Sequence, residues 1–82
     1  MSTRKAQGER PFRVYDGSSL GTAIKHYRRQ AGLTQEQLAE QAGISRSYLS
    51  RLEHGHQTEQ VKHILALLRQ LGVRMTLEHA DW

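Results

Sequence analysis

The sequence predicts an all-α domain of four or five helices that ends in one short β-strand. Three observations support this prediction: apolar residues recur at helical spacing in four segments, residues able to cap a helix precede these segments, and a glycine follows each of them. Only residues 72–78, GVRMTLE, alternate apolar and polar side chains as a strand does. The chain has 82 residues, enough for one domain with a modest core.

The first two helices carry clear start and stop signals. The first is expected to begin near Asp16 or Ser18, either of which can cap it, and to end at Gly32. The second opens at Thr34 with Gln37 three residues later, which is the spacing of a capping box. A glycine at position 43 closes this second helix.

The third and fourth helices are bounded in the same way. The third is expected to open at Ser45 and to end by Gly55, with most of its surface polar. The fourth starts near Thr58 and stops at Gly72. It carries the longest apolar stripe of the chain, formed by Val61, Ile64, Leu65, Leu68 and Leu71.

Charge and composition divide the chain into three regions. Residues 1–12 are polar and basic and are expected to form a disordered arm, residues 13–72 the helical domain, and residues 73–82 a strand with a short tail. The formal net charge is +4, concentrated toward the N-terminal end. This charge suggests an anionic partner, although charge alone fits a soluble surface with a solvated tail better.

Composition argues against several other classes of protein. The chain has no cysteine, so it has no disulfide framework and no thiolate metal site. Its longest apolar run, residues 64–68, is far too short to span a membrane, and the first residues lack the apolar stretch of a secretory signal. Because His54, His56 and His63 fit metal spacing poorly and no serine has an obvious base partner, we expect no metal, no cofactor and no enzymatic activity.

The most informative stretch is TQEQLAEQAGISRSYLSRLEHG, residues 34–55. Two capped helices are joined by a tight turn that contains Gly43, which allows them to meet at a steep angle as in a helix-turn-helix. The second helix of such a motif lies in the major groove of DNA and needs hydrogen-bonding side chains on its exposed N-terminal face. Here these are Ser45, Arg46, Ser47, Ser50 and Arg51.

Two further residues near these helices are candidates for contact with the DNA backbone. Gln35 lies at the start of the second helix, where free N–H groups suit a phosphate oxygen. Tyr48 could pack beside the sugar–phosphate backbone or be an ordinary half-exposed aromatic residue.

The motif TQEQLAEQAGIS followed by YLSRLEHG resembles the phage-repressor, or XRE-like, class of helix-turn-helix domains. The resemblance implies that Gln35, Arg46, Ser47 and Arg51 contact DNA and that Ser45 and Ser50 lie beside them. It also implies an internal ion pair between Arg28 and Glu53, so that Arg28 holds the fold and does not read DNA. Breaking such a pair would be costly.

A closer resemblance comes from the two ends of the domain. The segments RVYDGSSLGTAIKHYRRQAGLTQ and LLRQLGVRMTLEHADW are similar to those of the HipB-type antitoxins. This resemblance implies a small repressor whose C-terminal strand pairs with its copy across a two-fold axis, and a HipA-like serine/threonine kinase as toxin partner. The chain departs from that family in a longer, more basic N-terminal arm and a shorter tail.

The late strand needs a partner, because an unpaired strand leaves N–H and C=O groups exposed. We expect the partner to be the same segment of a second subunit, with Val73, Met75 and Leu77 forming the dimerisation face. The alternative is FRVY, residues 12–15, of the same chain. A two-fold homodimer would present two recognition helices about 34 Å apart and would bind a palindromic double-stranded DNA operator.

The sequence therefore predicts a cytoplasmic repressor, associated with the nucleoid when bound to DNA, that acts as the antitoxin of a type II toxin–antitoxin pair and regulates its own operon. One alternative is a stand-alone or phage-type repressor without a toxin. A second, of a different class, is a protein-interaction module that does not bind DNA, which Arg46 and Arg51 disfavour.

Overall fold

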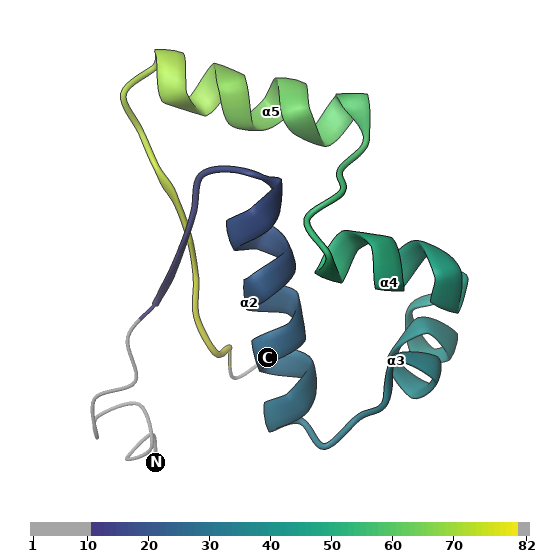
Figure 1. Ribbon diagram of the computed structural model, residues 1–82. Helices are drawn as coiled ribbons and strands as arrows, with labels where there is room; N and C mark the ends of the chain where they lie inside the picture. Colours follow the sequence, from purple (N-terminus) through teal and green to yellow (C-terminus); the bar gives the residue numbers. More distant parts are fainter. Residues whose placement is uncertain (1–10, 81–82) are drawn as a thin grey trace.

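The structure is a computed structural model that describes residues 11–80 (Figure 1). Most of the arm expected to be disordered, residues 1–10, lies outside the described residues. Helix α5 runs along one end of the molecule, and α3 and α4 lie together beside α2. The elements are β1 (Phe12–Val14), α2 (Gly17–Gln30), α3 (Gln35–Ala42), α4 (Arg46–Glu53), α5 (Glu59–Gln70) and β2 (Met75–Leu77).

Each helix begins at a residue that the sequence marks as a cap. Asp16 caps α2, and its carboxylate accepts a hydrogen bond of 2.8 Å from the backbone N–H of Ser19. Thr34 and Gln37 form the expected capping box of α3, in which each side chain accepts from the backbone N–H of the other. Helix α5 is capped by Thr58. The predicted helix starts are confirmed.

Helices α2 and α4 approach each other closely because α2 has a glycine at the contact. Gly21 is buried, and a Cβ atom at this position would lie 2.3 Å from the carbonyl oxygen of Leu52. No side chain could be accommodated there without moving the backbone. This close approach brings the end of α4 against α2, where Glu53 meets Arg28.

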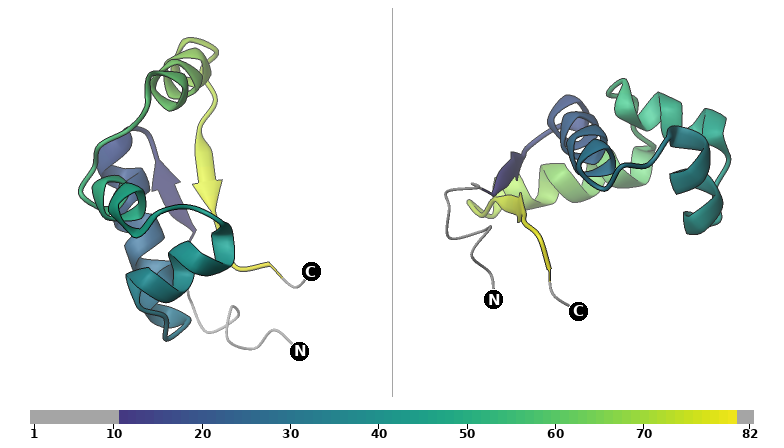
Figure 2. Two further views of the ribbon diagram at one scale, coloured as in Figure 1. Left: turned by 90° about the vertical axis from the view of Figure 1, so that its right-hand side faces the viewer. Right: turned by 90° about the horizontal axis from the view of Figure 1, so that it is seen from below.

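The late strand, expected to pair with a second subunit, has a partner within its own chain. Strand β2 pairs antiparallel with β1 of the same chain, so that Phe12 lies opposite Leu77 and Val14 opposite Met75 (Figure 2). The alternative pairing with residues 12–15 is therefore the observed one. Its physical reason is that these four apolar side chains share one face of the two-stranded sheet and together cover the core.

The core lies between this sheet, α2 and α5. Val14, Ala23 and Leu65 are buried at its centre, and Met75 and Leu77 pack against them. The Tyr27 hydroxyl of α2 donates a hydrogen bond of 3.0 Å to the carbonyl oxygen of Leu77. Two of the three residues expected at a dimer contact, Met75 and Leu77, thus belong to the core of their own chain.

Candidate nucleic-acid interface

Helices α3 and α4 form the predicted helix-turn-helix. Gly43 ends α3 in the left-handed conformation, with φ of +74°, which lets the chain turn sharply into α4. The backbone N–H of Ile44 closes the turn on the carbonyl oxygen of Ala39 at 3.0 Å. The Ile44 side chain is half-buried in the corner between the helices. The turn therefore fixes the direction in which α4 leaves α3.

One face of α4 is polar and directed to solvent. Arg46, Ser47 and Arg51 are exposed, and Ser50 is half-buried beside them. The Arg51 guanidinium donates a hydrogen bond of 3.0 Å to the Ser47 hydroxyl, one helical turn before it. Within residues 11–80, Arg46 makes no hydrogen bond or ion pair. This face presents cationic and hydroxyl groups to solvent, where they can bind a ligand.

Ser45 and Tyr48 shape the start of this helix. Ser45 caps α4, since its hydroxyl accepts a hydrogen bond of 3.0 Å from the backbone N–H of Tyr48. The Tyr48 side chain is half-buried and lines a hollow of about 130 Å³ with Arg51 and His56. Ser45 and Tyr48 thus border the exposed face of α4.

Gln35 has a partner within the protein. Its side-chain amide donates a hydrogen bond of 3.0 Å to the Glu53 carboxylate. Gln35 is the first residue of α3, so the free backbone N–H groups of that helix start lie beside it. The contact with Glu53 holds the side chain close to the helix start, where the sequence predicts contact with a phosphate.

Arg28 and Glu53 form a bidentate ion pair between α2 and α4. The Arg28 Nε donates to Glu53 Oε2 at 2.7 Å and Nη2 donates to Oε1 at 3.0 Å, while Nη1 donates to the carbonyl oxygen of Leu33 at 2.9 Å. The side chains are only 10% and 2% exposed, respectively. The pair joins α2, α3 and α4 into one unit.

The environment of Glu53 lowers the pKa of its carboxyl. Burial acts to raise this pKa, but the hydrogen bonds from Arg28 and Gln35 and the charges of Arg28 and Lys25 outweigh burial. The Arg28 partner keeps its charge at every accessible pH, because the hydrogen bond to Glu53 raises an already high pKa.

The lowered pKa of Glu53 predicts that the protein loses stability in acid. A depressed native pKa adds stability above the ordinary value of 4.5, and this stability is lost as the pH falls through the lower native value. Urea unfolding at a series of pH values should show this loss in the wild type and less of it in Glu53→Gln. The pKa of Asp16 is also lowered, mainly by its hydrogen bonds with Ser19, so Asp16→Asn measures that separate share. Equal acid sensitivity in the wild type and Glu53→Gln would contradict the prediction.

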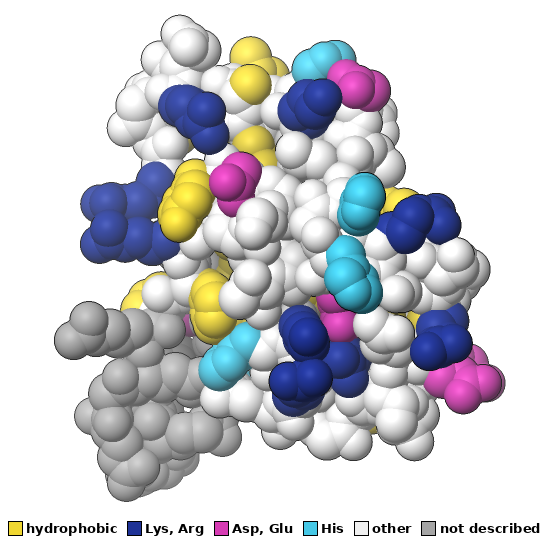
Figure 3. All heavy atoms as spheres, viewed as in Figure 1, with side chains coloured by type: hydrophobic (Ala, Val, Ile, Leu, Met, Phe, Trp, Pro, Cys, Tyr) yellow, Lys and Arg dark blue, Asp and Glu magenta, His cyan; other side chains and the backbone are white. Residues whose placement is uncertain are grey.

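His54 extends the exposed face of α4 and was not among the residues predicted there. It caps the C-terminus of α4, and its Nδ1 lies 2.8 Å from the carbonyl oxygen of Ser50. The signal that could have found it is spacing, because residues 47, 50, 51 and 54 follow helical periodicity. Figure 3 shows histidine, lysine and arginine side chains gathered on this side of the molecule.

Other kinds of site find little support in residues 11–80. No group of three histidine, aspartate or glutamate side chains there could hold a metal ion. No helix in that part of the chain combines the length and the apolar character needed to cross a membrane.

The two capped helices joined by a tight turn, with a polar and cationic face on the second one, define a helix-turn-helix protein. The helix-turn-helix family model matches residues 24–77, and the chain belongs to this XRE-type family of transcriptional regulators. The matched range contains all of α3, α4, α5 and β2 and the C-terminal half of α2.

Several bacterial and phage proteins are similar to this chain over the helix-turn-helix domain. An uncharacterised helix-turn-helix transcriptional regulator, y4dJ of Sinorhizobium fredii, is 39% identical over 66% of this chain and 70% of its own length. The antitoxin HipB of Escherichia coli is 31% identical over 79% of this chain and 69% of its own. The immunity repressor of Bacillus phage phi105 is 36% identical over 71% of this chain, which spans only 40% of that repressor.

Proposed function

We propose that this protein is a sequence-specific repressor that places α4 in the major groove of DNA. The observation that carries the proposal is the exposed face of α4, where Arg46, Ser47, Ser50 and Arg51 follow one side of a rigidly held helix. An arginine can bind guanine O6 and N7 together, and serine can bind several bases. Gln35, Ser45 and Tyr48 border this face and would position it against the backbone.

Arg46 is the residue expected to read a base. Its guanidinium has no competing partner within residues 11–80, and it lies in the first turn of α4. Arg46→Ala should weaken binding to the matched site by about 1–3 kcal/mol and relax the preference at one base pair. Titrations against a panel of single-base variants measure both effects, with Lys62→Ala on α5 as the control. Equal weakening on every sequence would assign Arg46 to phosphate.

The protein acts as a homodimer whose contact surface is centred on α5 and shares Val73 with the surface expected from sequence. Ile64, Leu67 and Leu71 lie on the outer side of α5 and are 50%, 63% and 72% exposed, and Val73 beyond the helix is 51% exposed. An apolar stripe of this size is unusual on a surface that remains in water. A second copy of the same stripe is the partner that also yields two recognition helices for a palindromic site.

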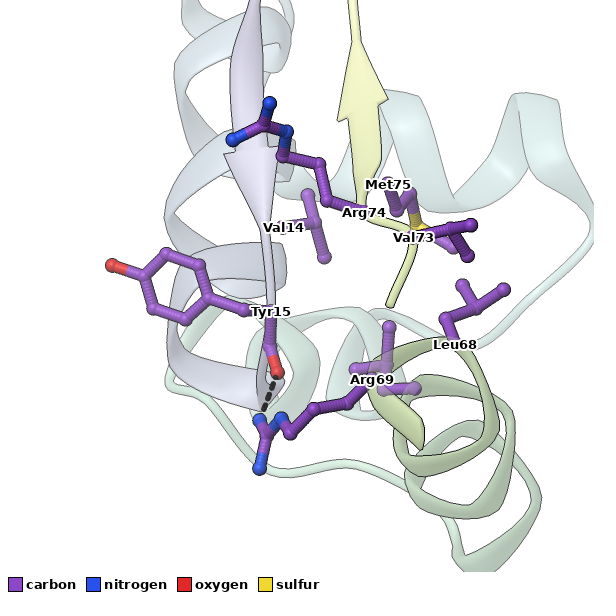
Figure 4. Close-up of a pocket in the computed structure, with 8 residues that line it drawn as sticks. Val14, Tyr15, Leu68, Arg69, Val73, Arg74 and Met75 are labelled. Atoms are coloured by element: carbon purple, nitrogen blue, oxygen red, sulfur yellow. Dashed lines mark hydrogen bonds between the residues drawn. The ribbon is translucent and has the colours of Figure 1, made fainter. Parts of the chain in front are cut away.

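A hollow lies beside this apolar stripe and could receive side chains of a second copy. The hollow has a volume of about 190 Å³ and lies between α5 and the two strands, with Leu68, Val73 and Met75 gathered around it (Figure 4). Arg69 closes one side, where its guanidinium donates a hydrogen bond of 2.8 Å to the carbonyl oxygen of Tyr15. Side chains of a second copy would fill an apolar hollow of this kind.

Leu67→Glu should therefore convert the dimer into a folded monomer, because it puts a charge into the centre of the apolar stripe. Sedimentation velocity measures the change, and circular dichroism checks that the helices remain. Gln60→Glu, which adds the same charge at an exposed position of α5, should leave the dimer intact. A dimer that survives Leu67→Glu would contradict this interface and point to the outer edge of β2.

The more specific role is that of an antitoxin that binds a HipA-like serine/threonine kinase and regulates its own operon. The similarity to antitoxin HipB over 79% of this chain supports it. The similarity to a phage immunity repressor equally supports a repressor without a toxin. The site on α4 serves both roles, so the partner distinguishes them.

Co-expression with the product of the neighbouring gene tests the antitoxin role. A stable complex with a kinase-like protein that also shifts the upstream DNA is the expected result. If the protein binds DNA but forms no complex with that product, the antitoxin role is contradicted and the repressor role still stands.

A further inference from the structure

The outer side of α2 forms a basic surface next to the helix-turn-helix. A hollow of about 570 Å³ is lined by Thr22, Lys25, His26, Arg29, Gln30 and Glu53. In Figure 3, lysine and arginine side chains cluster over the C-terminal half of α2. We call Lys25 and Arg29 the α2 basic pair. They lie four residues apart, so both side chains emerge on the same side of the helix.

The α2 basic pair carries an unbalanced charge. Both residues are exposed, and neither has an ion-pair partner within residues 11–80. Glu53 is the one carboxylate that lines the hollow, and Arg28 already neutralises it through two hydrogen bonds. The local charge is therefore about two positive units, which favours an anionic ligand.

The position of this charge relative to α3 indicates which anion it meets. Arg28 lies between Lys25 and Arg29 in the chain and donates to the carbonyl oxygen of Leu33, just before α3. Gln35 ties the first turn of α3 to Glu53 in the hollow. The α2 basic pair is thus adjacent to the start of α3, the part of a helix-turn-helix that approaches the DNA backbone.

The first turn of α3 would bind a phosphate poorly without added positive charge. Its backbone N–H groups attract an anion, but Glu36, also in that turn, is exposed and repels one. Two cations on the neighbouring helix offset this repulsion. Cations outside the groove cannot reach base edges, so their contribution is independent of sequence.

We infer that Lys25 and Arg29 bind backbone phosphates of the operator, on the flank of the segment that α4 reads. This inference rests on the proposed DNA-binding function and adds a second contact surface to it. The pair sets the affinity and register of the complex, whereas Arg46 sets its preference for sequence.

Salt titration of a double variant tests the inference. For Lys25→Gln/Arg29→Gln, the slope of log affinity against log salt should become shallower by about 3.6, because the dimer loses four phosphate contacts and each removes about 0.9. The loss of affinity should be the same factor on matched and shuffled DNA. The charge-matched control, Arg13→Gln/Lys62→Gln, removes two exposed cations elsewhere and should keep the wild-type slope. Exchanging the two cations, as Lys25→Arg/Arg29→Lys, should also keep it.

The remaining outcomes separate the inference from the function on which it rests. A steep wild-type slope that is unchanged in Lys25→Gln/Arg29→Gln overturns the phosphate contact and leaves the proposed function standing. A loss confined to matched DNA overturns it as well, since it indicates a role in reading sequence. A flat wild-type slope removes the proposed function itself. Urea unfolding of each variant ensures that only folded protein is compared.

Discussion

Replacing Arg28 with alanine is expected to lower the free energy of unfolding by about 3–5 kcal/mol. The guanidinium makes two hydrogen bonds to Glu53 and one to the carbonyl oxygen of Leu33, and the Glu53 side chain is only 2% exposed. Its removal leaves a carboxylate buried with Gln35 as its remaining hydrogen-bond donor. Because small domains are stable by only about 5–15 kcal/mol, this loss would be a large fraction of the total stability.

Urea unfolding at neutral pH measures this effect. The adjacent and exposed Arg29 provides the matched control, since Arg29→Ala should change stability by no more than about 0.5 kcal/mol. Replacing both partners, as Arg28→Met/Glu53→Met, should recover much of the loss, because no unpaired charge is then buried. A loss below about 1 kcal/mol in Arg28→Ala would show that the pair does not hold the helices together.

DNA affinity is expected to fall steeply as the salt concentration rises. A dimer that makes about 6–10 phosphate contacts should lose about 10³–10⁵ in DNA affinity between 50 and 200 mM salt. The cations available to each subunit near α4 are Arg46 and Arg51, with the α2 basic pair beside them. Fluorescence anisotropy with a labelled duplex measures the affinity at each salt concentration.

A flat salt response would contradict DNA binding altogether. It would favour the remaining alternative, a protein-interaction module built on the helix-turn-helix scaffold. Titration of a neutral peptide-nucleic-acid duplex of the same sequence provides the control, since it has no phosphates and should bind weakly at every salt concentration.

Local features of the fold could be predicted from the sequence because each depends on a few neighbouring residues. Thr34 and Gln37 satisfy each other's backbone N–H groups, so the start of α3 is determined within four residues. Gly43 takes the positive φ that the turn requires. These features together define the helix-turn-helix and also the family that the comparisons identify.

Features that depend on distant contacts were harder to predict. Strand β1 has only three residues, too few to show an alternation that would mark it as the partner of β2. The apolar stripe of α5 also gave no indication that Leu65 is buried while Ile64 and Leu71 are exposed. Periodicity counts the apolar residues on a helix but does not say how many neighbours cover them.

In the candidate site, too, local features could be predicted from the sequence and long-range contacts could not. The exposed face of α4 followed from helical spacing, and so does His54 at its end. The contact of Gln35 with Glu53 and the hydrogen bond from Arg51 to Ser47 depend on side-chain geometry that a sequence does not contain. The unbalanced charge of the α2 basic pair could not be predicted from sequence, because it depends on Arg28 neutralising Glu53.

Selection of DNA from a random-sequence pool by the purified wild-type protein tests the central claim most directly. A dimer with two α4 helices should enrich an inverted repeat whose half-sites are centred about one helical turn, or a multiple of it, apart. The Arg46→Ala variant should enrich the same repeat with one position in each half-site relaxed. Enrichment of a single asymmetric half-site, or of no sequence at all, would contradict the proposed two-fold repressor.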